Sequence, residues 1–497
     1  MATADRLAAL SPEQRALFER LREKSRQAAP AVRTPPPVRR ASGPDGTGDW
    51  PLSFDQERLW RMHQERPYLV SWNVDAGSRI LGALDVPLFL RAFHEVVRRH
   101  AAFRTVFPVV STEMGGKPVQ RVVSFLAPEA SFLDVSALPA GLREAAGHRA
   151  IYDHTRQPFD LARGPLLRLA LVRLAEREHL FLLTVHHLAT DWVTFQILFA
   201  ELLQIYDALR AGRAPFLPLL PAQFPDYVLW ERERWQGEAL EAETAFWRRH
   251  LDGYPLVLDL SSVLPGSRPR PAVQSQRGGL YQVRAGAARS DRMRELAQRE
   301  GGTMFMAVLA VLGIAIGRVT GLERFLLGSN GANRALPELG PVTGFFLNQI
   351  PFAIDLTGNP TYRELLGRVR KTALATYAHQ NLPFSKLIET LGADDDGKRN
   401  PVVQVLLLLL QGQSSTETGD LRFEPVGLYD GNCRWDLMFG LYDYHDAGLT
   451  GPLEYNADIF DPAAIGRLLD LFYRLLDAVA ADPDARLSDL PQLEGAG

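Results

Sequence analysis

Cysteine is almost absent from this sequence, which has a single one, Cys433, among 497 residues. One cysteine excludes an internal disulfide and a thiolate metal cluster, and it favours a reducing cytoplasm. An excess of charge of one sign is also lacking, since 55 basic and 58 acidic residues leave a net charge of −3. A chain so balanced has no global field that would attract nucleic acid or an anionic membrane.

Long hydrophobic runs are missing as well. No stretch reaches the roughly 18 consecutive apolar residues that a membrane-spanning helix needs. The opening residues 1–14 lack the basic region and apolar core of a secretory signal. Hydrophobic residues make up 46% and charged residues 23% of the chain, as in ordinary globular proteins. We therefore expect a cytoplasmic protein with no nucleic-acid and no membrane partner.

The first 48 residues differ in composition from the rest. Residues 1–26 predict an amphipathic helix, because Ser11 is placed to cap it, Pro12 suits its first turn and Gln14 completes a capping box. Residues 27–48 are rich in Pro, Ala and Arg and predict a flexible linker. The helix is either a linker-side extension or a docking element for another protein, and amphipathicity alone does not decide between them.

The body of the chain alternates helical and strand-like patterns, which predicts α/β layering. A proline-rich segment at 214–225 divides this body, so we expect a first lobe at 49–215 and a second at 216–490. The periodicity predicts helices over Val86–Arg98, Trp192–Arg210, Ser290–Arg299, Met304–Val319, Tyr362–Tyr377 and Pro462–Ala481. It predicts strands over 179–186, 323–330 and 402–410.

The strongest chemical signal is the segment HHLATDW at 186–192, between an expected strand and an expected helix. The imidazole of His186 or His187 has an ordinary pKa near 6.5 and is suited to accept a proton from an attacking amine or hydroxyl. Asp191 is placed to orient a ring or an arginine. In a purely structural interpretation, the two histidines end a strand and Asp191 caps the next helix. Both interpretations fit this segment taken alone.

Metal and covalent chemistry have less support. No third ligand stands at a recognisable spacing, and adjacent histidines on a strand point to opposite faces, so we expect no metal. There is no G-x-S-x-G elbow, and Cys433 has no local nucleophile context. Direct attack of one substrate on another, with a histidine as base, is the simpler scheme.

Ordered motifs across the chain give these residues a family context. HHLATDW resembles the HHxxxDG core of the condensation domains of nonribosomal peptide synthetases. The other segments similar to that family's motifs, in order, are LSFDQERLW (52–60), RRHAAFRTVF (98–107), FPDYVLWERE (224–233), GFFLNQIPF (344–352), HQNLPFSKLIE (379–389), RNPVVQVLL (399–407) and LEYNADIFD (453–461). The order and number of these matches make the resemblance specific.

The resemblance implies a fold and partners. It implies two chloramphenicol-acetyltransferase-like lobes in a V-shaped pseudo-dimer, a central tunnel between them, and floor and latch loops from the second lobe. It also implies a monomer without a permanent cofactor. Phosphopantetheine arms would arrive on a donor acyl or peptidyl carrier protein and on an acceptor carrier, or a small soluble amine or alcohol would replace the acceptor carrier.

The resemblance also implies roles for individual residues. His187, the second histidine of the motif, would lie beside the attacking nucleophile, with His186 next to it. Asp191 would be structural and salt-bridged to an arginine such as Arg99 or Arg104. Asn348 matches the asparagine of the loop that closes over the tunnel.

Three positions depart from the family pattern. Trp192 stands where glycine is usual. It either packs inward with Phe195 and Phe199, or narrows the acceptor side of the tunnel and selects an unusual nucleophile, or leaves the domain inactive. The inward packing is the interpretation that we favour from the sequence. Gln349 replaces a threonine and Ala353 an arginine, changes that would alter carrier or substrate contacts.

Other functions remain open at this stage. They are an ester- or amide-forming release enzyme with a small soluble acceptor, a catalytically silent recruitment or gating module, and a coenzyme-A-dependent acyltransferase. The segment 436–440 only loosely resembles the DFGWG element of the last class. Epimerisation and heterocyclisation domains fit the motifs less well. Because no adenylation or carrier motif occurs, we expect a free-standing or excised condensation domain, whose donor, acceptor and stereochemical subtype the sequence does not specify.

Overall fold

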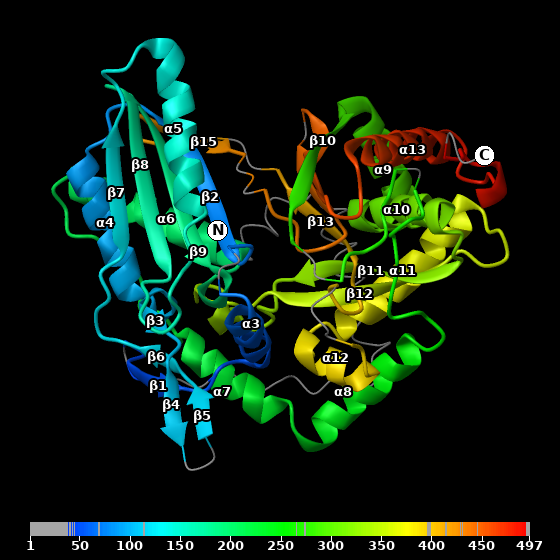
Figure 1. The fold of residues 1–497 in the computed structure, drawn as a ribbon, viewed down its shortest axis with the longest axis horizontal. Helices are drawn as coiled ribbons and strands as arrows, with labels where there is room; N and C mark the ends of the chain where they lie inside the picture. The colour runs from blue at the N-terminus through cyan, green and yellow to red at the C-terminus, as the bar shows by residue number, and fades with distance from the viewer. Residues whose placement is uncertain are drawn as a thin grey trace.

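The computed structural model describes residues 38–493, except for 39–40, 42, 44, 68–69, 113–114, 265, 273–274, 395–398, 413–414, 428, 430 and 445. The helix predicted over 1–26 lies outside the described residues, as does most of the linker predicted over 27–48. The remainder forms two lobes that lie side by side, each built on its own sheet with flanking helices (Figure 1). The predicted α/β class is confirmed, while the tunnel between the lobes stays a prediction.

The first lobe is built on a sheet whose described strands follow the order β14-β15-β2-β9-β8-β7. Its central strands β8 and β9 are almost continuously buried because helices cover both faces of the sheet. The strands are β2 (Asn73–Leu81), β7 (Glu129–Asp134), β8 (Leu167–Ala175), β9 (Glu178–His186), β14 (Thr416–Thr418) and β15 (Leu421–Val426), and the helices are α4 (Val86–Arg99), α5 (Ala140–Thr155) and α6 (Trp192–Arg210).

The second lobe has the strand order β10-β17-β16-β13-β11-β12. Helix α10 is apolar nearly all round because it is the central helix of this core, packed against α9, α11 and α13. The strands are β10 (Gly278–Gly286), β11 (Arg324–Gly331), β12 (Asn348–Asp355), β13 (Val405–Gln411), β16 (Leu437–Tyr444) and β17 (Gly448–Asn456), and the helices are α9 (Ala287–Arg299), α10 (Met304–Thr320), α11 (Tyr362–Ala378) and α13 (Pro462–Ala481).

Smaller elements complete the described structure. They are α3 (Phe54–Glu65), α7 (Phe224–Arg234), α8 (Gly237–His250), α12 (Phe384–Leu391), β1 (Gly48–Trp50), β3 (Thr105–Val106), β4 (Val109–Thr112), β5 (Gly115–Pro118), β6 (Gln120–Val122) and the 3-10 turns at Ala101–Arg104, His187–Ala189, Pro337–Leu339 and Leu487–Asp489. Helix α3 packs on α12, and both lie below the gap between the lobes in Figure 1.

The proline-rich segment at 214–225 does not divide the chain completely into the two lobes, because one later strand belongs to the first lobe. Strand β15, which comes from the range expected for the second lobe, pairs antiparallel with β2 of the first lobe. The chain therefore crosses to the first lobe after β13 and returns before β16, as the orange strand in Figure 1 shows. Arg434, which lies between β15 and β16, contacts the first lobe at Ser71 and Asn73.

Most predicted elements are observed with small shifts at their ends. The predicted Trp192–Arg210 and Pro462–Ala481 helices have the same bounds in the structure. The strand predicted from residue 402 begins instead at Val405, because Val402 follows a proline and has a φ of 62° that no strand allows. No single described helix has both the length and the apolar character to cross a membrane, and only α9 with α10, bent by 107°, meets that test as a pair.

Candidate active site

The segment 186–191 lies where β9 ends and α6 begins. His186 is the last residue of β9, His187 opens a 3-10 turn, and Asp191 caps α6. The apolar run of β9 carries the chain to this point as a buried strand, and the aspartate begins α6 by accepting the N–H of Thr194. The structural interpretation is thus confirmed for His186, which ends the strand, and for Asp191, which caps the helix, whereas His187 lies after the end of the strand.

His186 is buried and fixed by its neighbours. Its Nδ1 accepts the N–H of Leu188 at 3.2 Å, so its proton is on Nε2. Its ring meets the rings of His63 and Phe159 edge to face, with centroids 5.2 and 6.1 Å away. Burial, followed by the charges nearby, holds the pKa of His186 well below its ordinary value. This histidine is a neutral packing residue beside the site.

His187 has the opposite arrangement. Its Nδ1 lies 3.0 Å from the carbonyl oxygen of Thr190, and because a carbonyl only accepts, Nδ1 carries the proton. Nε2 is then the ring's basic nitrogen, and it has no hydrogen-bond partner within the described part of the chain. The half-buried ring lies between Trp72 of the first lobe and Phe345 of the second, at centroid distances of 6.2 and 4.9 Å.

The His187 ring is uncharged at neutral pH. Burial lowers its pKa from 6.5 to about 4, and the charge of Arg434 contributes in the same direction. A neutral imidazole with one tautomer fixed and Nε2 open is equipped to take a proton from a nucleophile that lies within hydrogen-bonding reach of Nε2.

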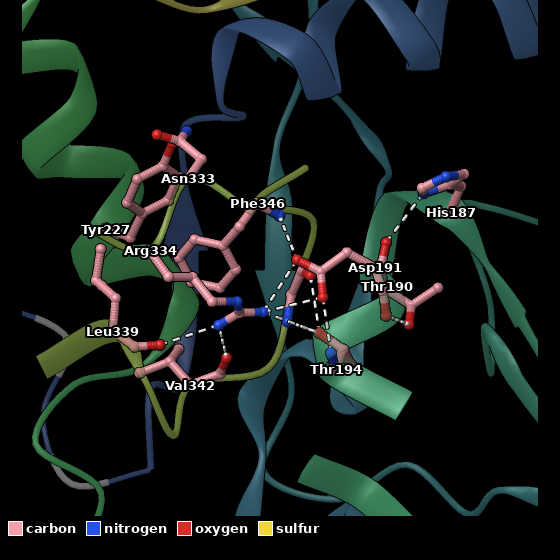
Figure 2. A network of polar contacts seen from close by, with 11 residues as sticks. His187, Thr190, Asp191, Thr194, Tyr227, Asn333, Arg334, Leu339, Val342 and Phe346 are labelled. Atoms are coloured by element: carbon pink, nitrogen blue, oxygen red, sulfur yellow. Dashed lines mark hydrogen bonds and ion pairs between the residues drawn. The ribbon is translucent and has the colours of Figure 1, made fainter. Parts of the chain in front are cut away.

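Asp191 is held by a network that links the two halves of the chain (Figure 2). Both carboxylate oxygens lie 3.0 Å from Nη2 of Arg334, and the two side chains are only 3% and 6% exposed. The carboxylate also accepts the N–H groups of Thr194 at 2.7 Å and Phe346 at 3.2 Å. Its oxygens are thus fully occupied, and Asp191 is a scaffold for the turn.

Arg334 is in turn surrounded by second-lobe groups. Its Nη1 donates to the carbonyls of Leu339, at 2.9 Å, and Val342. Its guanidinium lies 3.9 Å from the centroid of the Phe346 ring. The loop 332–346 is therefore closed around this arginine, and the arginine ties the loop to α6.

The partners predicted for Asp191 were wrong. Arg99 binds Glu201 of α6 and the carbonyl of Pro218, and Arg104 binds the carbonyls of Asp45 and Val123. Arg334 fills the role instead. It lies outside the matched motifs and 143 residues from Asp191, so the local pattern contains no signal for it.

Asn348 is buried at the start of β12 and has an architectural role. Its Nδ2 donates to the carbonyls of Gln380 and Leu382, at 2.6 and 2.7 Å, and its Oδ1 accepts the N–H of Phe384 at 2.9 Å. The amide therefore uses both of its hydrogens and fixes the turn before α12.

The two departures that follow Asn348 are buried too. Gln349 accepts a hydrogen bond from Asn400 at 3.2 Å, and Ala353 lies in the apolar cluster around α8, α12 and the start of β13. Their side chains thus contact the protein interior.

Trp192 does not pack inward, contrary to the interpretation favoured from the sequence. Phe195 is buried and Phe199 packs against the first-lobe core, but Trp192 is 38% exposed. Its ring centroid lies 6.4 Å from that of Tyr442, on β16 of the second lobe. The first turn of α6 faces the opposite lobe, so this indole lies between the lobes beside the histidine segment.

Cys433 is buried, and its Sγ donates to the carbonyl of Trp435 at 3.0 Å. Burial holds the pKa of its thiol well above the ordinary value, so the thiol stays protonated. No group of three or more histidine, cysteine or carboxylate side chains in the described residues is arranged to hold a metal.

A family model described as "Condensation domain" matches residues 47–496 of the chain. The chain belongs to the condensation-domain family. This is the family of acyltransferases that form peptide bonds in nonribosomal peptide synthetases, so the expected family and enzyme class are confirmed.

Curated relatives agree with this assignment. The chain is 36% identical over 493 residues to phosphinothricin tripeptide synthetase PhsC of Streptomyces viridochromogenes, covering 98% of this chain and 44% of that protein. It is 34% identical over 459 residues to the isonitrile lipopeptide synthase of Mycobacterium tuberculosis, covering 90% of this chain and 18% of that protein. The chain thus spans less than half the length of these relatives.

Solved structures share the fold. The X-domain from teicoplanin biosynthesis matches with a TM-score of 0.80 at 30% identity. The match covers 92% of this chain and 100% of the X-domain. The condensation domain of the Monacolin K polyketide synthase MokA has a TM-score of 0.77 at 22% identity, covering 88% of this chain and 99% of that one. The second match supports the fold alone.

Proposed function

We propose that this condensation domain transfers an acyl group from a carrier-bound thioester to the amine of an acceptor, with His187 beside the reacting nitrogen. The observation that carries the proposal is the fixed tautomer of His187, whose Nδ1–H is bonded to the Thr190 carbonyl and whose Nε2 is free to accept. A pKa of about 4 keeps this ring in its accepting form throughout the physiological range.

The step is balanced without a further reactant. The amine nitrogen attacks the thioester carbonyl, a C–N bond forms, and the C–S bond breaks. The amine proton passes through Nε2 of His187 to the departing thiolate, which leaves as a thiol. Holding both substrates end to end would remove much of the entropic barrier.

The partners in this proposal are a donor carrier protein and an acceptor, each presented on a phosphopantetheine arm, with no cofactor bound permanently. A hydroxyl acceptor would give an ester by the same proton transfer, and a small soluble amine or alcohol would make the domain a chain-releasing enzyme. We place the reaction in the cytoplasm, in keeping with the single cysteine.

The test is a mass-spectrometric condensation assay. A carrier-loaded acyl donor is offered a panel of free and carrier-bound amines and alcohols, with wild type and His187→Ala compared at equal concentration. Product with wild type that is lost with His187→Ala supports the proposal, and the preferred acceptor identifies amide or ester formation. Absence of product with every acceptor, from a protein that binds the loaded carrier, would overturn it.

One observation favours a second candidate, a recruitment module. The X-domain of teicoplanin biosynthesis, seen in complex with OxyB, has a TM-score of 0.79 and is 29% identical to this chain. A recruitment function for this chain would show as binding of a partner enzyme without product in the condensation assay.

A further inference from the structure

Residues 431–436, which precede β16, bring Arg434 from the second half of the chain onto the first lobe. Its Nε donates to the carbonyl of Ser71, and its Nη2 donates to the carbonyl of Asn73 at 3.0 Å. Its guanidinium carbon lies 5.3 Å from the centroid of the Trp72 ring. One side chain therefore contacts three consecutive residues at the entrance to β2.

These three residues also contact the histidine segment. Asn73 is the register partner of His186 in the β2–β9 pair. The backbone N–H of His187 donates to the carbonyl of Trp72 at 2.8 Å, and the Trp72 ring meets the His187 ring edge to face. Arg434, Trp72 and His187 thus form a continuous series, so a shift of Arg434 would be transmitted to the imidazole.

The uncompensated charge near the His187 imidazole is positive. Arg434 opposes protonation of both His187 and His186. The neighbouring titratable groups are His186 of β9, which is neutral, and Asp191, whose charge is compensated by Arg334. Around His186 lie also His63 of α3 and Arg168 of β8, and neither adds negative charge. A permanent cation therefore acts on His187 without an opposing free anion among these groups.

We propose that Arg434 is a positioning residue for His187: it fixes residues 71–73 and the Trp72 ring against the imidazole, and it places a permanent positive charge beside this series of contacts. The consequence for activity rests on the proposed function, whereas the consequence for the ring itself does not. A guanidinium suits both roles because it offers a rigid fork of donors and stays charged at every relevant pH.

Three substitutions separate the charge from the hydrogen bonds. Arg434→Lys keeps the charge and loses the fork, Arg434→Gln keeps one donor and loses the charge, and Arg434→Met loses both. Arg149→Met is the matched control, since Arg149 is an exposed helical arginine paired only with Asp153 one turn away.

The primary readout is the pKa of His187, measured by NMR on protein labelled with ¹³C at the histidine Cε1 position. The His187 signal is assigned by its loss in His187→Ala. We expect Arg434→Gln and Arg434→Met to raise the pKa of His187 by about 0.5 to 1 unit. It would remain below 6.5 because burial persists, and Arg434→Lys and Arg149→Met would leave it unchanged.

An unchanged His187 pKa in Arg434→Gln would overturn the proposal, and so would an equal shift in Arg434→Lys and Arg434→Gln. If Arg434→Met fails to fold, the Lys and Gln variants still decide the question. A single-turnover condensation assay adds the second arm, in which Arg434→Lys loses rate without a change in pKa. If wild type makes no product, the proposed function fails while the NMR arm still reports on Arg434.

Discussion

The two ends of the segment 186–191 are built in contrasting ways. At the aspartate end, each carboxylate oxygen of Asp191 is engaged by Arg334 and by backbone N–H groups. At the histidine end, His187 makes one hydrogen bond from its ring and leaves Nε2 open. Asp191, whose hydrogen-bonding capacity is used up inside the protein, thus lies only four positions after His187, whose Nε2 is still able to accept a hydrogen bond.

This difference assigns the two ends to different tasks. A fully bonded carboxylate opposite an arginine is a rigid anchor, and breaking it leaves an uncompensated buried charge. A ring with a fixed tautomer and a free nitrogen is a group prepared to meet a substrate. We therefore expect substitutions at the aspartate end to change stability and substitutions at the histidine end to change rate.

The largest effect on stability is expected for Arg334→Ala. It leaves the Asp191 carboxylate buried without its cation, which costs about 3–5 kcal/mol of unfolding free energy. The measurement is urea denaturation. The control is Arg98→Ala, which breaks an exposed pair with Glu95 and costs about 0–1 kcal/mol. Equal losses in the two variants would contradict the view of Asp191 as an anchor.

Glu231 is a second buried carboxylate, and it can be compared with Asp191 because its hydrogen-bond donors are neutral groups instead of an arginine. Glu231 of α7 accepts the hydroxyl of Tyr227 at 2.8 Å and the N–H of Phe54 at 3.1 Å. Asp55 beside it accepts the N–H groups of Phe384 and Ser385 at the start of α12. Burial and then the nearby Asp55 raise the pKa of Glu231 to about 7.

We expect this acidic cluster to make stability fall as pH rises. A folded pKa of about 7 against 4.5 when unfolded means that the native state holds its proton more tightly. The contribution is fully present below pH 4.5 and is lost as pH rises through about 7, on the order of 3 kcal/mol. Glu231→Gln should flatten unfolding free energies measured from pH 5 to 8. If unfolding free energy falls with pH as steeply in Glu231→Gln as in wild type, Glu231 is not the source of the pH dependence.

The smallest effect is expected at Trp192, which follows the anchor but faces the other lobe. Trp192→Gly removes the ring that meets Tyr442 and should raise kcat/KM for a bulky acceptor relative to a small one by about tenfold. Trp192→Phe should keep the wild-type preference. Competition between two acceptors in one condensation assay gives the ratio directly. An unchanged ratio in Trp192→Gly would show that the indole does not limit the acceptor.

The sequence predicted what local signals encode. The bounds of α6 follow from the cap at Asp191 and the apolar periodicity after it, and the family motifs located His186, His187 and Asp191 in one segment. Arg334 was missed because an ion pair between residues 143 apart depends on how the lobes meet. Arg99 and Arg104 were expected as partners because they lie in a family motif, but in the structure both bind other groups.

Two other features depend on long-range packing in the same way. Strand β15 is short and partly exposed, and its place in the first lobe depends on its pairing with the distant strand β2. The exposure of Trp192 depends on the position of Tyr442 in the other lobe, whereas helical periodicity alone favoured an inward position. Both features lie where the halves of the chain meet, and a pattern read along one element does not encode them.

The most direct test of the account is the single-turnover rate of amide formation by His187→Ala and by Asp191→Asn, each corrected for its folded fraction. We expect His187→Ala to lose about 10²–10⁴-fold in rate while its stability stays near that of wild type. Asp191→Asn should lose stability but keep a rate per folded molecule within about tenfold of wild type. The reverse result, a fast His187→Ala and a folded but inactive Asp191→Asn, would contradict the assignment of chemistry to the histidine end.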